Sequence, residues 1–288
     1  MFMTDYPLAE VTSLGVGGPA DFFCRPKSAM EVAQAQSYAR ENNLPLTVIG
    51  YGTNLLIRDG GIRGVVMQIA HHFAQAKVEG NILTATTGCL MSSLAKLALH
   101  HGLSGLEFAV GIPGGLGGAT YMNAGAYGGE IGPLIRGVEF VQNGSIGHWN
   151  RDEFHFSYRS SRLQNEVDQA IVTQVELELS LGEQEKILQE MNKLQHQRRS
   201  KQPLEYPSAG STFKRPSGHY VGPMIEKAGL KGLRIGGAEV STKHAGFVIR
   251  VGKATARDFL ELISIIQGTI LQEFGIELEP EIRILGES

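Results

Sequence analysis

The chain has 288 residues and a formal net charge of −3, from 26 lysines and arginines against 29 aspartates and glutamates. That balance excludes the strongly basic surface on which binding to a nucleic-acid backbone depends, and a hydrophobic fraction of 42% excludes wholesale disorder. Glycine is unusually frequent, with 37 residues, against roughly 7% in ordinary proteins. The glycines are clustered, so we expect loops in which the backbone approaches another group closely.

Cysteine usage and the apolar segments favour a cytoplasmic protein. Cys24 and Cys89 show no paired spacing, so two buried free thiols are favoured over a disulfide framework or a zinc ribbon. Residues 1–10 lack the basic start of a signal peptide. The uncharged run 108–129 is long enough for a membrane span, but eight of its residues are glycines, so it would form a poor helix. We therefore expect no membrane segment.

Hydrophobic periodicity and capping residues predict helices over four segments: 28–43, 90–101, 183–199 and 255–274. Ser28 and Glu31 form a capping box at the start of the first helix, and Thr255 and Asp258 form another at the start of the last. The last helix has an apolar face, which consists of Phe259, Leu262, Ile263, Ile266, Ile270 and Phe274.

Short apolar or alternating segments predict strands at 46–49, 65–69, 82–86, 138–141, 146–149, 171–179 and 277–285. Asn143-Gly144 predicts a tight hairpin turn. The strands do not alternate strictly with helices, which favours an α+β fold over a doubly wound sheet. After Lys201, three prolines between 203 and 216 indicate a domain boundary or an active loop.

The common nucleotide-binding fingerprints are not supported by their context. Gly15, Gly17 and Ala20 match a G-x-G-x-x-A pattern, but Pro19 interrupts it and residues 21–23 favour a strand. The dinucleotide fingerprint requires a helix there, because the pyrophosphate sits at the helix N-terminus. The P-loop pattern is also absent from the sequence.

Two other glycine-rich runs suit a phosphate or a flat ligand. Residues 50–56 follow a predicted strand, and Thr53 and Asn54 add side-chain donors to the backbone N–H groups. The second run, 111–119, continues through 122–128 without a charged residue. Tight turns between strands are the alternative interpretation, but two long runs in one chain favour a ligand cradle.

Six motifs occur in order along the chain: Gly50-x-Gly-Thr-Asn-Leu, Gly-Ile-Pro-Gly at 111–114, Asn123-x-Gly-Ala-Tyr127, Phe156-x-Tyr-Arg159, Ala209-Gly-Ser-Thr-Phe-Lys214 and Leu278-x-x-Glu281-x-Arg283. Together they resemble the motifs of the UDP-N-acetylenolpyruvoylglucosamine reductases, the MurB family of FAD enzymes in peptidoglycan precursor synthesis. The resemblance runs from about Thr12 to Gly286. The short separation of Arg159 from Ser211 is similar to that of the type II subgroup.

This resemblance implies a two-lobed FAD-binding unit of the vanillyl-alcohol-oxidase (PCMH) type, with lobes at 1–57 and 58–200. It also implies an α+β substrate-binding domain at 201–288, whose last strand, 277–285, returns to the active site. FAD would be the cofactor and NADPH the co-substrate in the reduction of a UDP-sugar nucleotide to UDP-N-acetylmuramate. Beyond these small molecules we expect no nucleic acid, membrane or obligate protein partner, and no metal site, because the histidines show no ligand spacing.

The resemblance assigns the catalytic roles to Arg159, Ser211 and Glu281. Arg159 would bind the substrate carboxylate, where negative charge builds as the hydride arrives, through its planar and permanently charged fork. Ser211 would donate a proton, and Glu281 would face the enolpyruvyl group while protonated or paired. Taken alone, the same residues would be a surface arginine, a turn or capping serine, and a solvent-facing glutamate.

The resemblance also implies contacts with the cofactor for Gly50, Tyr51, Gly52, Thr53, Asn54, Leu55, Ile112, Pro113, Gly114, Gly118, Asn123, Gly125, Ala126, Tyr127 and Arg283. Substrate or NADPH phosphate contacts are implied for Tyr158, Lys201, Lys214, Arg215 and His244. Family members often carry asparagine where this chain has Arg215. His244 is either a ligand contact or a structural histidine, and its sequence context does not decide between the two.

Two other functions remain open from the sequence. An FAD-dependent oxidoreductase of the same fold acting on another substrate would keep the glycine runs but lack Ser211 and the Lys214-Arg215 pair. A nucleotide-binding regulator or a degenerate flavoprotein would have lost Arg159, Ser211 or Glu281. All of these residues are present, which favours the reductase.

Overall fold

The structure, a computed structural model, describes residues 2–164 and 170–288. The chain forms two compact units. Unit 1 consists mainly of Phe23–Tyr51 and Gly64–Arg198, and unit 2 consists of Thr4–Phe22, Gly52–Arg63 and Arg199–Ser288. The chain passes from one unit to the other between Tyr51 and Gly52 and within four elements: β1 (Met3–Pro7), β2 (Pro19–Cys24), β5 (Ile62–Gln68) and α4 (Gln184–Lys201). The three-part division at 57 and 200 stays a prediction.

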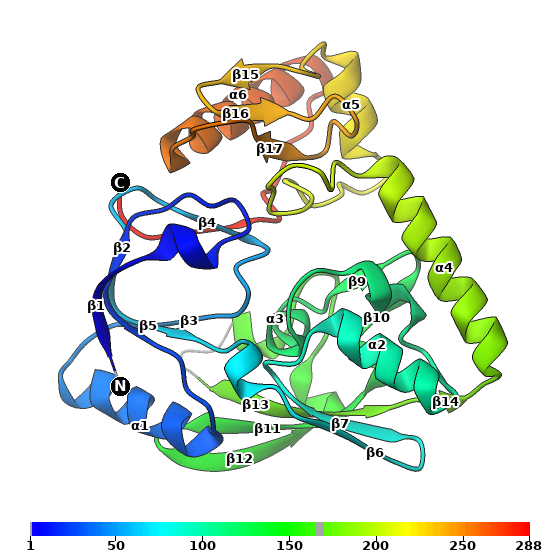
Figure 1. The fold of residues 1–288 in the computed structure, drawn as a ribbon. Coiled ribbons are helices and arrows are strands. Elements are labelled where there is room, and N and C mark those ends of the chain that lie inside the picture. The colour runs from blue at the N-terminus through cyan, green and yellow to red at the C-terminus, as the bar shows by residue number, and fades with distance from the viewer. Residues whose placement is uncertain (1, 165–169) are drawn as a thin grey trace. The chain divides into compact units, whose positions relative to one another are not determined.

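Unit 1 contains a five-stranded antiparallel sheet in the order β12-β11-β13-β7-β6 (Figure 1). Its strands are β6 (Ala76–Glu79), β7 (Ile82–Thr86), β11 (Ile135–Gln142), β12 (Ser145–Asn150) and β13 (Ile171–Glu178). Asn143 and Gly144 join β11 to β12 with φ of 52° and 80°, as a type I′ turn requires. Four of the five strands confirm predicted segments, whereas the polar strand β6 was not expected.

The helices of unit 1 are α1 (Ala29–Glu41), α2 (Met91–His100), the short α3 (Leu116–Tyr121) and α4. The Ser28 N-cap of α1 is confirmed, because the Ser28 hydroxyl accepts a hydrogen bond from the Glu31 N–H at 3.2 Å. The reciprocal half of the predicted capping box is not formed, because the Glu31 side chain accepts the Lys27 N–H at 2.8 Å instead of that of Ser28. Side chains of α2 and α4 form a single core with the five-stranded sheet, for example Leu94, Met191 and Val175. The buried face of α2 begins at Met91, since Leu90 is the N-cap and is 37% exposed.

The shorter elements of unit 1 pair locally. β3 (Leu46–Ile49) runs parallel to β5, with Leu46 opposite Val65. β8 (Leu103–Ser104) pairs with β14 (Ser180–Leu181), and β9 (Gly125–Ala126) pairs with β10 (Gly129–Glu130). The 3-10 helices of the described chain are Leu8–Val11, His71–Phe73, Glu107–Gly111, Gly132–Leu134, Arg151–Phe154 and Arg162–Gln164.

Unit 2 packs two helices, α5 (Val221–Lys227) and α6 (Ala256–Phe274), with a three-stranded antiparallel sheet (Figure 1). The sheet has the order β15-β16-β17, formed by Arg234–Ile235, Ala238–Val240 and Val248–Arg250. The predicted apolar face of α6 is confirmed, because all its members lie in or against the core of this unit. The capping box at Thr255 and Asp258 is confirmed as well.

The C-terminal strand is shorter than predicted. Only β18 (Arg283–Leu285) is a strand, and it pairs in parallel with β4 (Leu55–Ile57). The expectation of a continuous strand from 277 was wrong, because Pro280 has no N–H to donate to a ladder. The segment before β18 instead makes an isolated bridge between Phe213 and Pro280.

No helix in the described ranges is long and apolar enough to cross a membrane.

Candidate active site

The glycine-rich run of unit 1 is folded against the loop between β7 and α2. The Leu116 and Gly117 N–H groups donate to the carbonyls of Cys89 and Thr87, at 2.8 and 2.9 Å. Tyr51, which follows Gly50 at the end of β3, donates its hydroxyl to the Gly88 carbonyl at 2.8 Å. Part of the run therefore serves its own fold, as the tight-turn interpretation requires.

Two further glycines of this run have opposite surroundings. Gly118 is exposed, and a Cβ placed on it would meet no atom within 4 Å. Gly115 is buried against the Tyr51 ring, where a Cβ would come within 2.9 Å of the ring. The run thus combines a packed side toward Tyr51 with an open side at Gly118, and the open side suits a flat or phosphate-bearing ligand.

A hairpin presents Tyr127 to solvent. Gly125–Ala126 pairs with Gly129–Glu130, and the loop residues Tyr127 and Gly128 have φ of 53° and 88°. This is the geometry of a type I′ turn, which normally carries asparagine or glycine at its first loop position. Tyr127 is 43% exposed although it is aromatic. A strained and exposed aromatic residue beside a glycine cradle is a candidate ligand contact.

Asn123 organises this corner of unit 1. Its side-chain N–H₂ donates to Glu130 Oε2 at 3.1 Å and to the Ser157 carbonyl at 2.9 Å. Its Oδ1 accepts the Gly132 N–H at 3.0 Å. Asn123 is 2% exposed, and both the nitrogen and the oxygen of its side-chain amide form hydrogen bonds within the fold. A direct contact of Asn123 with a cofactor stays a prediction.

Arg159 occupies a tight turn with a left-handed backbone. The N–H groups of Ser157 and Ser160 donate to each other's carbonyl at 3.1 Å, so Tyr158 and Arg159 form the loop between them. Arg159 has φ of 54°, at the position where turns of this kind usually carry glycine. Its Nη2 donates to the Gly125 carbonyl at 3.0 Å, and its guanidinium lies 5.3 Å from the centroid of the half-exposed Tyr158 ring.

In unit 2, the segments that carry Ser211 and Glu281 lie side by side. The Glu281 N–H donates to the Thr212 carbonyl at 2.9 Å, and the Lys214 N–H donates to the Glu279 carbonyl at 2.8 Å. Thr212 is buried and its hydroxyl accepts the Val248 N–H at 3.0 Å, which anchors this loop to β17. Ser211 is exposed next to this anchor. The structure therefore brings the predicted proton donor and the predicted acid to neighbouring backbones.

The first glycine motif joins the same cluster through Asn54. Its side-chain amide donates to the Glu281 carbonyl at 3.0 Å, and its own carbonyl accepts the Arg283 N–H at 2.9 Å. Arg283 then pairs with Leu55 in the β4–β18 ladder. Gly52 has φ of 66° and a Cβ there would collide with the Val11 carbonyl, so this position needs glycine.

The predicted phosphate contacts of unit 2 lie around the same loop. Lys214 forms an ion pair with Glu279, and the Arg215 guanidinium lies 3.8 Å from the centroid of the exposed Tyr220 ring. Lys201 is exposed at the end of α4. Lys201 and Arg215 are exposed and accessible to an anionic ligand, whereas Lys214 is partly buried and already paired with an acidic side chain.

His244 is partly buried and accepts a structural hydrogen bond. Its Nδ1 accepts the Gly246 N–H at 3.1 Å, and its ring meets Phe247 edge to face at 4.9 Å. Burial lowers the pKa of His244 below its ordinary value; its backbone hydrogen bond opposes this, and the charge of Lys201 lowers the pKa further. The imidazole is therefore neutral near pH 7, with its proton on Nε2. Nδ1 is structural, and a ligand contact through Nε2 stays a prediction.

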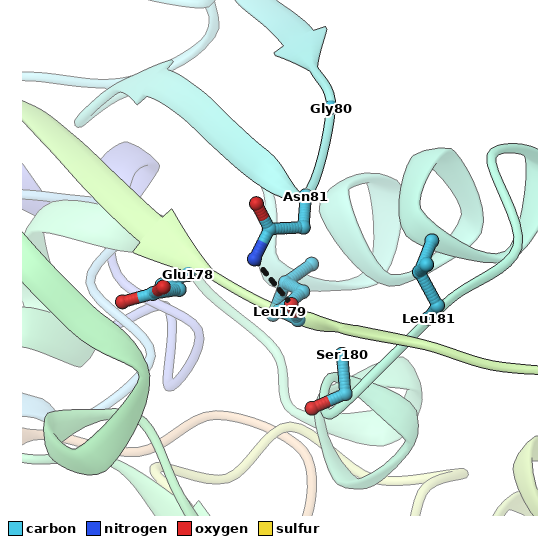
Figure 2. A pocket seen from close by; sticks show the side chains of 6 residues that line it. All are labelled: Gly80, Asn81, Glu178, Leu179, Ser180 and Leu181. Carbon is cyan, nitrogen blue, oxygen red and sulfur yellow. Dashed lines mark hydrogen bonds between the residues drawn. The ribbon is translucent and has the colours of Figure 1, made fainter.

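A shallow depression on unit 1 is separate from all these residues. It is lined by Gly80, Asn81 and residues 178–181 (Figure 2). The Asn81 amide donates to the Leu179 carbonyl at 3.1 Å, and Leu181 is 83% exposed. The depression contains none of the predicted site residues, so we assign it no function.

The predicted site residues thus form two clusters, one in each unit. The cluster of unit 1 contains Tyr51, the run 111–118, Tyr127 and Arg159, and that of unit 2 contains Asn54, Ser211, Glu281 and Arg283. Each cluster is positioned by hydrogen bonds within its own unit.

Comparisons with known proteins fit this division. An FAD binding domain model matches residues 20–146, and a model of the C-terminal domain of UDP-N-acetylenolpyruvoylglucosamine reductase matches residues 202–285. The UDP-N-acetylenolpyruvoylglucosamine reductase of Levilactobacillus brevis is 48% identical over 286 residues, which cover 99% of this chain and 93% of that protein. The chain belongs to the UDP-N-acetylenolpyruvoylglucosamine reductase family. The family resemblance read from the six motifs is confirmed.

Other members of the reductase family extend the match. The Lactobacillus helveticus reductase is 48% identical over 98% of this chain and 94% of its own length. The crystal structure of the reductase from Thermus caldophilus is 34% identical, covers 99% of this chain and 100% of its own, and has a TM-score of 0.86. The expected α+β fold with an FAD-binding unit and a reductase C-terminal domain is confirmed. Membership of the type II subgroup stays a prediction.

Proposed function

We propose that this chain reduces the enolpyruvyl group of UDP-N-acetylenolpyruvoylglucosamine to give UDP-N-acetylmuramate, a step of peptidoglycan synthesis. FAD is the bound cofactor, NADPH is the reductant, and the reaction takes place in the cytoplasm. Family membership over nearly the whole chain supports the reaction. The assignment of catalytic roles to individual residues is supported by one observation, the adjacency of the Ser211 and Glu281 backbones in unit 2.

The residues present fit FAD. Gly52 is held in a conformation that excludes other residues, Gly118 leaves its backbone open, and Tyr127 offers an exposed ring for stacking. Thr53, Asn54 and Arg283 add polar and cationic groups beside Gly52. Gly50–Leu55, Ile112–Gly114, Gly118, Gly125–Tyr127 and Arg283 would hold the cofactor. When bound, FAD would supply the hydride chemistry that couples oxidation of NADPH to reduction of the enolpyruvyl double bond.

Arg159 acts on the substrate carboxylate. Reduction of a double bond conjugated to a carboxylate places negative charge on that carboxylate, so a fixed cation there stabilises the transition state more than the ground state. The Arg159 fork is held by the Gly125 carbonyl and by a turn that fixes its backbone. A positioned guanidinium needs little reorganisation when the charge develops.

Ser211 donates the proton to the carbon that bears the carboxylate. A serine hydroxyl is a weak acid, so it serves only against a strongly basic, carbanion-like centre on the substrate. Thr212 anchors the Ser211 loop to β17, which holds the exposed hydroxyl in one place. Glu281, on the adjacent segment, faces the same substrate group and is protonated or paired there, so that it does not repel the carboxylate.

The test replaces Ser211 by alanine in the full chain. In anaerobic stopped-flow measurements, Ser211→Ala should still allow NADPH to bleach the flavin absorbance at the parent rate. Reoxidation by the sugar nucleotide should slow by about 100-fold or more, because general-acid catalysis typically contributes that much. Ser217→Ala, at an exposed serine of the following loop, is the matched control and should leave both steps unchanged. Reoxidation of Ser211→Ala at the parent rate would remove Ser211 from the role of proton donor.

A further inference from the structure

Arg198 is a partly buried cation that has no counter-charge among the residues that the structure describes. It lies near the end of α4 and belongs to unit 1. Within residues 2–164 and 170–288, its guanidinium makes no hydrogen bond and no ion pair. The neighbouring Arg199 is instead exposed to solvent, and its carbonyl accepts a hydrogen bond from Lys243 at 3.0 Å.

Arg198 lies beside two parts of unit 1 that are predicted to contact a ligand. A Cβ on Gly111 would lie 2.8 Å from Arg198 Cδ, so the arginine stem packs directly on the start of the Gly-Ile-Pro-Gly run. Tyr127, the strained and exposed aromatic residue of the β9–β10 hairpin, is close enough to influence its charge. Arg198 therefore lies close to both ends of the glycine-rich run, where residues are predicted to contact the cofactor.

The energetics of this position favour a ligand. Burial lowers the pKa of the Arg198 guanidinium below its ordinary value, and Tyr127 only partly offsets this. Arginine stays charged nevertheless, so the cost of its desolvation is not relieved by loss of a proton. A partly desolvated cation with no protein partner is stabilised when an anion binds to it.

We propose that the Arg198 guanidinium binds a diphosphate oxygen of a ligand seated on Gly111–Gly118 and Tyr127. The inference rests on the proposed function, whose three ligands, FAD, NADPH and the UDP-sugar, all carry a diphosphate. The planar fork of arginine matches two phosphate oxygens at once. The run 111–118 beside it contributes no acidic side chain. The carboxylate of the substrate is assigned to Arg159 in the same unit.

Three variants of the full-length protein separate the charge of Arg198 from its packing. Arg198→Met keeps the aliphatic stem and removes the charge, Arg198→Lys keeps a charge without the fork, and Arg199→Met is the matched control on the next residue. The apoprotein of each is titrated with FAD by flavin fluorescence, and its melting temperature is measured without ligand. The Michaelis constants for NADPH and the sugar nucleotide are measured on the FAD-loaded proteins.

The expected result is a dissociation constant for FAD that rises by about 10- to 100-fold in Arg198→Met, as for loss of a charge-assisted hydrogen bond. Arg198→Lys should be intermediate, and Arg199→Met unchanged. The melting temperature of ligand-free Arg198→Met should not fall, because the removed cation has no hydrogen-bond or ion-pair partner in the described part of the chain. If FAD affinity is kept and one Michaelis constant rises by 10-fold or more, the diphosphate belongs to that ligand and the inference still holds.

Unchanged binding of all three ligands to Arg198→Met would overturn the inference. A lower melting temperature of its ligand-free form, with Arg199→Met unaffected, would overturn it too, because it would assign Arg198 to the fold. Failure of the proposed function would appear differently, as a wild-type protein that takes up FAD but does not reduce the sugar nucleotide. In that case the FAD titration still tests whether Arg198 binds a diphosphate.

Discussion

Several residues of the unit 1 cluster have backbones that ordinary side chains rarely adopt. Asn123, Tyr127 and Arg159 have φ of 43°, 53° and 54°. Asparagine tolerates the left-handed region, but tyrosine and arginine cost of order 1 kcal/mol there. A turn that needed only to reverse the chain would use glycine at these positions. The strain at Tyr127 and Arg159 is therefore better explained by what their side chains do than by the fold.

Arg159→Gly tests this explanation at the residue scale. Glycine relieves the left-handed strain but loses the hydrogen bond to the Gly125 carbonyl, so the free energy of unfolding should stay within about 1 kcal/mol of the parent. Turnover should fall by about 100-fold or more, because the cation facing the substrate carboxylate is gone. Denaturant unfolding and steady-state kinetics measure the two effects.

Asn143→Gly is the matched control for this prediction. Asn143 has φ of 52° in the β11–β12 turn of the same unit and is not among the predicted site residues. It should leave both stability and turnover almost unchanged. A loss of several kcal/mol in Arg159→Gly would show instead that the arginine holds the turn together.

At the scale of elements, the sequence predicted those features that depend on interactions between residues close together in the chain. The Ser28 N-cap of α1, the capping box of α6 and the Asn143-Gly144 turn are satisfied by residues within four positions of each other. The C-terminal segment is different. Glu281 bonds to Thr212, and Arg283 to Asn54, so its course depends on partners that are far away in the sequence.

Dependence on partners that are distant in sequence also limits what can be predicted of the site. Ser211 and Glu281 were predicted from motifs, but their adjacency depends on the pairing of two loops that no local pattern encodes. Arg198 gave no signal at all, because an arginine near the end of a charged helix is normally a solvated residue. Only its packing against Gly111 and its lack of a counter-charge distinguish it from Arg199.

The N-terminus of α6 provides a prediction for a single element. The Thr255 N–H lowers the pKa of Asp258 below its ordinary value of 3.8, an effect that burial opposes and that the Gly237 N–H reinforces. The carboxylate also lies at the positive end of the helix. Asp258→Asn should therefore lower the free energy of unfolding at pH 7 by about 0.3–1 kcal/mol.

The pH dependence of this difference has a defined sign. Because the folded pKa of Asp258 lies below the unfolded one, its stabilisation is fully present above the unfolded value and disappears as pH falls through the folded value. Chemical denaturation should show a constant difference between parent and Asp258→Asn from pH 7 to pH 5, which shrinks below pH 4. Glu261→Gln, one turn further along α6, is the control. A difference that persists at the lowest pH would mean that the charge of Asp258 does not act at the helix end.

At the scale of the whole molecule, each unit has a hydrophobic core of its own. Unit 1 is built around the five-stranded sheet and unit 2 around α6. Both cysteines and the single tryptophan, Trp149, belong to unit 1. The expectation of two buried free thiols is confirmed, with Cys24 and Cys89 exposed by 1% and 6%. Thiol labelling therefore reports selectively on the opening of unit 1.

The native thiols should be inert. Burial raises the pKa of Cys24 to about 12, which leaves about one thiolate in ten thousand at pH 8, and burial raises the pKa of Cys89 as well. The native protein should react with a thiol reagent at least about 100-fold more slowly than the unfolded chain. Ser93→Cys, at an exposed position of α2, should add one fast-reacting thiol. In increasing denaturant, the reactivity of Cys89 should rise together with the change in Trp149 fluorescence, since both side chains belong to the core of unit 1. Immediate labelling of either thiol in the folded protein would contradict the burial that the structure assigns to it.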